Sequence, residues 1–139
     1  MRGPGRNESF VPDEGDVVEM DFGPVQGHEQ DGVRPAIVLS PKALNGSGIG
    51  IFVPMTTRVS GARTELPILS FNPERKGVAL ITQLTCLDWR ARKAEFRGRL
   101  SRDELLKVRY YARLMLGALP AGYRPPRYRN GALRWRAPF

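Results

Sequence analysis

The amino-acid sequence predicts a small α+β protein, mainly β, in which a strongly bent antiparallel sheet or partly open barrel carries one C-terminal helix. Two observations predict this fold class. About six short apolar or alternating segments, separated by turn residues, precede residue 100. One amphipathic helical segment follows them. With 139 residues, 41% of them hydrophobic, the chain fits one domain with one core.

The expected strands are short runs of β-branched or alternating apolar residues. They lie at residues 15–22, 35–39, 49–53, 65–69, 78–81 and 93–100. The first alternates Val18, Met20 and Phe22 with acidic residues, which is typical of a half-buried strand. A turn at residues 45–48 precedes the third strand, and Pro54 is expected to close it. Pro67 confines the fourth strand to a sheet edge, and the alternating sixth is expected to be an outer strand.

The C-terminal helix has clear boundaries. Ser101 and Glu104 have the spacing of a capping box, and Gly117 stands where a helix C-terminal glycine belongs. Four apolar residues recur at helical spacing on one face. They are Leu105, Val108, Ala112 and Met115.

Three segments are expected along the chain: a flexible leader at 1–14, a folded domain at 15–118 and a basic tail at 119–139. The formal net charge is +8, with a sequence pI near 10.4. The tail contributes +5 of this charge, from five arginines and no acid. Such a balance suits a polyanionic partner, although a basic protein without a nucleic-acid role has the same composition.

The sequence also predicts a cellular location. No run approaches the roughly 20 apolar residues of a membrane span, and the polar N-terminus lacks the apolar stretch of a signal peptide. Cys86 is the single cysteine, which excludes an internal disulfide and a thiolate zinc site. We therefore expect a cytoplasmic protein with no metal and no cofactor.

A polyanionic partner of a basic chain can be RNA, and RNA can be cleaved without a metal. His28 is the single histidine, which argues against catalysis by a histidine pair, and no strand carries carboxylates spaced for two metals. Attack by the ribose 2′-OH needs a base, an acid and a cation for the charged transition state. Glu29 and Arg34 could share those roles, with Pro35 holding Arg34 in an extended conformation. A solvated loop with one surface salt bridge explains the same spacing.

Thr56 and Thr57 follow the third expected strand. A hydroxyl at a strand end can bind a phosphate oxygen. The alternative is a turn in which the hydroxyls cap the local backbone.

The order of several landmarks resembles the MazF/PemK (Kid) family of toxins, over roughly residues 11–118. The matching segments are Gly15–Val18, Asp21–Pro24, Gly27–Gln30, Arg34–Ser40, Val53–Thr57, Gly77–Leu80, Gln83, Asp88–Arg92 and the helix from Ser101 to Gly117. The resemblance implies a small SH3-like, CcdB/PemK-like barrel and a homodimer. It also implies the toxin of a type II toxin–antitoxin system, a sequence-specific mRNA interferase. Such enzymes cut single-stranded RNA without a metal and leave a 2′,3′-cyclic phosphate and a 5′-OH.

The resemblance also implies roles for particular residues. Arg34 matches the catalytic arginine and Thr56 the catalytic threonine, which would bind the scissile phosphate. Glu29 matches a glutamate that some members use as a base. The residues expected to bind RNA are Gln30, Thr57, Gln83, His28 and Arg90.

The resemblance implies a cognate antitoxin, MazE-like, with a flexible, often acidic segment that would cover the loop containing Glu29 and Arg34. Two other functions remain open at this point: a non-catalytic toxin on the same fold, such as a gyrase poison, and a basic RNA-binding module. The tail at 119–139 either adds non-specific RNA affinity or keeps the protein in solution.

Overall fold

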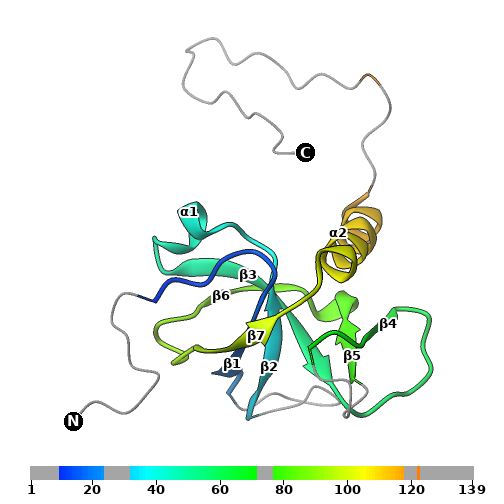
Figure 1. Ribbon diagram of the computed structural model, residues 1–139, viewed down its shortest axis with the longest axis horizontal. Helices are drawn as coiled ribbons and strands as arrows, with labels where there is room; N and C mark the ends of the chain where they lie inside the picture. Colours follow the sequence, from blue (N-terminus) through cyan, green and yellow to red (C-terminus); the bar gives the residue numbers. More distant parts are fainter. Residues whose placement is uncertain (1–9, 24–31, 72–76, 118–121, 123–139) are drawn as a thin grey trace.

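Seven strands in the described part of the chain form one antiparallel sheet, in the order β4-β5-β3-β2-β1-β7, with β6 also paired to β3 (Figure 1). The structure is a computed structural model that describes residues 10–23, 32–71, 77–117 and 122. The elements are β1 (Asp16–Asp21), β2 (Val33–Val38), α1 (Lys42–Asn45), β3 (Ile49–Thr56), β4 (Glu65–Ile68), β5 (Gly77–Leu80), the 3-10 helix η1 (Ile81–Gln83), β6 (Thr85–Asp88), β7 (Glu95–Arg99) and α2 (Arg102–Leu116). The predicted fold class is confirmed, although the sheet does not close into a full barrel.

All six predicted strands are present, with β4 and β7 at the two ends of the sheet as expected. Three elements were not predicted: α1, η1 and β6. Two boundaries were wrong, because β2 already begins at Val33 and β3 continues through Pro54 to Thr56. These two extensions matter, because they carry Arg34 and Thr56 out of the expected loops and into the sheet.

The backbone register explains how β3 passes through Pro54. The Leu39 N–H donates to the Ile51 carbonyl at 2.9 Å, so odd-numbered residues of β3 point their backbone groups at β2. The backbone nitrogen of Pro54, which carries no hydrogen, therefore points away from β2. On that side β6 pairs with the first half of β3 and β5 pairs with its end, while η1 stands between them. Pro54 meets this break in the ladder, where a strand proline is tolerated.

The sheet buries apolar side chains on both faces. One cluster contains Val17, Ile37, Val53, Met55 and Val108, and α2 packs on it. The opposite cluster contains Val18, Met20, Ala36, Phe52 and Trp89. Because successive side chains of a strand point to opposite faces, strands buried on both sides read as continuous apolar runs, as in residues 36–38.

Helix α2 begins and ends where the sequence predicts. The Ser101 hydroxyl accepts a hydrogen bond from the Glu104 N–H at 3.2 Å, and Gly117 adopts a φ of 87°. The reciprocal half of the capping box is absent. The Glu104 carboxylate instead accepts hydrogen bonds from the N–H groups of Leu69 and Ser70, both at 2.8 Å, which ties the helix to the end of β4.

The predicted apolar face of α2 needs one correction. Val108 and Ala112 are buried and Leu105 is half-buried, but Met115 is 41% exposed. Its neighbours Leu114 and Leu116 are 49% and 73% exposed, so the last turn of the helix contributes little to the core. Among the described helices, none has the length and apolar character needed to cross a membrane.

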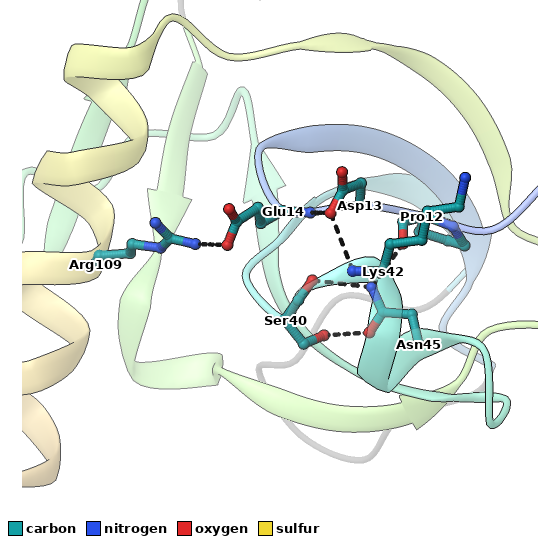
Figure 2. A network of polar contacts seen from close by, with 7 residues as sticks. All are labelled: Pro12, Asp13, Glu14, Ser40, Lys42, Asn45 and Arg109. Carbon is teal, nitrogen blue, oxygen red and sulfur yellow. Dashed lines mark hydrogen bonds and ion pairs between the residues drawn. The ribbon is translucent and has the colours of Figure 1, made fainter. Parts of the chain in front are cut away.

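The predicted flexible leader is also corrected in part, since residues 10–14 pack against the domain (Figure 2). The fully buried Asn45 side chain donates to the Pro12 carbonyl at 2.7 Å and to the Ser40 carbonyl at 2.9 Å. Glu14 forms an ion pair with Arg109 of α2. Residues 1–9 of the leader lie outside the described residues, as does the tail at 119–139 apart from Gly122.

Candidate active site

Arg34 is the second residue of β2, where it pairs with Met20 of β1. Pro35 restricts the preceding residue to extended backbone, which suits a strand and not a loop. The Arg34 side chain is buried, with 8% of its surface exposed. Its guanidinium carbon lies 4.7 Å from the centroid of the Phe22 ring, within the range of a cation–π interaction. The ring and the strand together fix where the cation lies.

Thr56 and Arg34 lie at neighbouring ends of β3 and β2. The β2–β3 pairing ends at Ala36 and Pro54, and Arg34 and Thr56 each lie two residues further along their strands, on the same face as Ala36 and Phe52. Continuation of the same register would set the two side chains opposite each other. Thr56, like Arg34, is only 8% exposed. A buried arginine and a buried hydroxyl thus belong to the same end of this sheet face.

The Thr56 hydroxyl also caps the local backbone, as the turn alternative expects. Its Oγ1 accepts a hydrogen bond from the Arg58 N–H at 3.1 Å. This bond fixes the direction of the hydroxyl and is compatible with a second contact to a ligand. Thr57, the next residue, is exposed in a bend outside the strand.

The other predicted site residues are distributed differently. Gln83 ends η1 beside the middle of β3 and is half-buried. Arg90 lies beyond β6, whose last residue pairs with the first residue of β3. Arg90 is therefore at the opposite end of β3 from Thr56, about 20 Å away at roughly 3.3 Å per residue. His28, Glu29 and Gln30 lie outside the described residues.

Phe22 is a site residue that the sequence analysis treated only as part of a strand and a landmark. Its position in the sequence was a signal. In a pair of antiparallel strands, the residue just after the end of the first strand lies beside the residue just before the second strand, and so close to the start of that strand. The Phe22 N–H donates to the Gly32 carbonyl at 3.1 Å, which continues the β1–β2 pairing and sets the ring beside Arg34.

Arg34 and Thr56 together have the chemistry to bind a phosphate. A planar guanidinium with five N–H donors suits a phosphate, and a hydroxyl next to it can hold a second phosphate oxygen. Both side chains are largely buried, and electrostatic interactions are stronger in a buried site than in water. Among the described residues, no three His, Cys, Asp or Glu side chains gather in a group that could hold a metal ion.

Comparison with known proteins gives a consistent result. Residues 13–116 match the family described as PemK-like, MazF-like toxin of type II toxin-antitoxin system. The endoribonuclease toxin MazF of Escherichia coli K12 is 41% identical over 109 residues, which covers 78% of this chain and 96% of that protein. The endoribonuclease toxin ChpB of the same strain is 37% identical over 97 residues, covering 67% and 83%.

Solved structures agree with the sequence comparison. The crystal structure of MazF (Form-I) from Deinococcus radiodurans superposes with a TM-score of 0.71 at 40% identity, covering 78% of this chain and 99% of that one. A crystal structure of MazE-MazF (Form-II) from the same organism gives a TM-score of 0.70 at 39% identity, covering 80% and 100%.

Proposed function

The chain belongs to the PemK-like, MazF-like toxins of type II toxin–antitoxin systems, and we propose on that premise that it is an endoribonuclease whose catalytic pair is Arg34 and Thr56. It cleaves single-stranded RNA, including mRNA, at specific sequences and so inhibits translation and growth. The observation that supports this most directly is the burial of two polar side chains, a cation and a hydroxyl, each two residues beyond the Ala36–Pro54 pair on one sheet face.

The proposed reaction is an in-line attack of the ribose 2′-OH on the adjacent phosphorus. The new O–P bond closes a 2′,3′-cyclic phosphate as the bond to the 5′-oxygen breaks, and the leaving oxygen takes a proton to become a 5′-OH. No metal is required in this scheme. DNA has no 2′-OH, so the protein is expected to bind DNA without cutting it.

In this proposal Arg34 neutralises the charge that develops on the phosphorane-like transition state and also protonates the leaving oxygen. A fixed cation is most effective where the surroundings do not have to reorganise, and the Phe22 ring and β2 hold this one in place. Thr56 binds an oxygen of the scissile phosphate. Glu29 is the proposed base that removes the 2′-OH proton.

RNA binding extends beyond the reacting groups. We include Gln30, Thr57, Gln83, His28 and Arg90 among the residues that contact RNA. Thr57 directly follows Thr56, and Gln83 lies in η1 beside β3. Arg90 is remote from both and would contact a different nucleotide. The arginine-rich tail at 119–139 adds affinity that does not depend on sequence.

The proposed partners are a second copy of the chain and a MazE-like antitoxin, and the proposed compartment is the cytoplasm, where mRNA is found. Relatives crystallised as MazE-MazF support the antitoxin. On α2 the large apolar side chains of Leu106, Tyr110 and Leu114 recur at four-residue spacing and are 50%, 56% and 49% exposed. Burying this stripe against a second copy would remove apolar surface from water.

The decisive experiment incubates the purified chain with a long single-stranded RNA in EDTA. Defined fragments ending in a 2′,3′-cyclic phosphate, formed by the wild type and absent with Arg34→Ala, are expected. Intact RNA with the wild type would reject the nuclease. Gyrase inhibition without RNA cleavage would favour the non-catalytic toxin, and tight RNA binding without cleavage would favour the binding module.

A further inference from the structure

The segment of residues 57–64 joins Thr56 to β4 and is exposed throughout. One side chain at its end organises it. The Glu65 carboxylate accepts hydrogen bonds from the Ser60 N–H at 3.1 Å, from the Ser60 hydroxyl, and from the Ala62 N–H at 3.3 Å. The Glu65 N–H donates back to the Ala62 carbonyl at 3.1 Å. Residues 60–65 are thus folded around a single carboxylate.

The other end of this segment is attached to the proposed catalytic hydroxyl. The Arg58 N–H donates to Thr56 Oγ1 at 3.1 Å. Between the two attachments Gly61 has a φ of +86°, a left-handed conformation that L side chains rarely adopt. The segment therefore has a preformed shape, fixed to Thr56 at one end and to Glu65 at the other.

The segment carries positive charge beside the site. Arg58 and Arg63 are its two basic residues, and both are exposed. Glu65, the adjoining acid, has its oxygens engaged by the segment's own donors. Its hydrogen bond from the Ser60 hydroxyl is the main cause that lowers the pKa of the Glu65 carboxyl below its usual 4.5, so the carboxylate stays ionised at neutral pH.

We propose that Glu65 is a positioning residue that holds the 57–64 segment in one conformation beside Thr56, so that Arg58 and Arg63 bind the RNA phosphates flanking the cleaved one. This inference rests on the proposed endoribonuclease function. A segment that is ordered before RNA arrives loses less conformational entropy on binding. Glu65 therefore acts on substrate affinity and not on the chemical step.

Glu65→Gln tests the proposal at nearly constant side-chain size. The amide keeps an acceptor oxygen at the Oε1 position, which takes the bonds from Ser60 and Ala62, but it places an N–H donor against the Ser60 N–H at the Oε2 position and removes the negative charge. We expect KM for RNA to rise about tenfold, with kcat within about twofold of the wild type. The melting temperature should stay within a few degrees. Glu95→Gln is the matched control, because Glu95 is an exposed carboxylate on β7 that contacts Arg97 and not this segment.

A second measurement uses an RNA with a 2′-deoxy nucleotide at the cut site, which binds but cannot react. Arg58→Ala and Arg63→Ala should each reduce the slope of log affinity against log salt by about 0.7, the value for one phosphate contact on a single strand. In the Glu65→Gln background the same substitutions should have a smaller effect, because their side chains are no longer held in place.

Several results would overturn the proposed positioning role of Glu65. Wild-type KM and wild-type salt slope in Glu65→Gln would do so, as would a loss of kcat that follows a fall in melting temperature. If the wild-type protein does not cut RNA, that result would instead contradict the proposed endoribonuclease function. The binding measurement on the 2′-deoxy RNA would still report on Glu65 in that case.

Discussion

The two ends of β3 each place an arginine against an aromatic ring, and they use it differently. At the start of the strand the Arg90 guanidinium carbon lies 4.4 Å from the centroid of Trp89. Arg90 is exposed and donates to the Gly46 carbonyl at 3.3 Å, while the Trp89 indole N–H donates to the Asn45 carbonyl at 2.8 Å. At the other end Arg34 stacks on Phe22 at 4.7 Å but is buried beside Thr56.

This contrast teaches that a stacked arginine is not by itself a functional signal. An exposed guanidinium on a ring, bonded to a carbonyl, is compatible with a role in packing alone. A buried charge is costly unless other interactions compensate for it, so its retention is a stronger sign of a binding or catalytic role. The resemblance assigned Arg34 to catalysis and Arg90 to RNA binding, and the two arginines also differ in burial.

The largest expected effect is the loss of cleavage in Arg34→Ala. Removing one preorganised group that stabilises transition-state charge typically costs about 10²–10³ in rate. We expect a loss of this size in initial rates on a long RNA, and little rescue by lysine, which cannot present a planar fork. Equal losses in Arg34→Ala and Arg90→Ala would remove the distinction between the two ends of β3.

Asn45→Ala should instead reduce stability. Asn45 is fully buried, and besides its two donated bonds its Oδ1 accepts from the Ser40 hydroxyl at 2.5 Å (Figure 2). Its removal leaves the carbonyls of Pro12 and Ser40 without this donor, at a cost of about 2–3 kcal/mol in free energy of unfolding. Urea denaturation measures this loss. Ser47→Ala, on the adjacent exposed turn, is the control, and a similar loss there would contradict the assignment.

Thr56→Val should lower kcat by about tenfold to a hundredfold, because the isosteric side chain no longer binds a phosphate oxygen. Thr57→Val, one position outside the strand, should remain within about twofold. Single-turnover cleavage at saturating enzyme separates this effect from RNA affinity. If the two variants lose equal activity, the opposition of Thr56 and Arg34 is not what matters.

The smallest expected effect is that of Arg90→Ala. An exposed stack with two long hydrogen bonds to one backbone carbonyl is worth about 0.5–1 kcal/mol of stability. Thermal unfolding should shift by a few degrees, and, because the nucleotide that Arg90 is proposed to contact is remote from the cleaved one, kcat should stay within about twofold and the position of RNA cleavage should not change. An altered pattern of cut sites would show that the far end of β3 also reads the RNA sequence.

The pattern of apolar residues predicted most of the sheet because period-two alternation and turn residues act locally. Helix α2 was predicted for the same reason, since the Ser101 cap and Gly117 act over one turn. The elements that were missed depend on distant partners. The short strand β6 has two apolar residues between two polar ones and so shows no alternation by itself, and it exists because β3 supplies its hydrogen bonds. Pro54 was read as a strand end because the break at η1 that tolerates it is invisible in sequence.

For the site, the sequence by itself determined which residue types were available: one arginine held extended by Pro35, one threonine after an apolar run, and the landmarks of the family. Only the tertiary structure decided which of them meet. The β2–β3 pairing brings the strand ends that carry Arg34 and Thr56 together, the β1–β2 pairing sets Phe22 beside the guanidinium, and the β3–β6 pairing places Arg90 at the far end. The reason is physical: local sequence sets backbone preferences, whereas register depends on hydrogen bonds and burial between strands far apart in the chain.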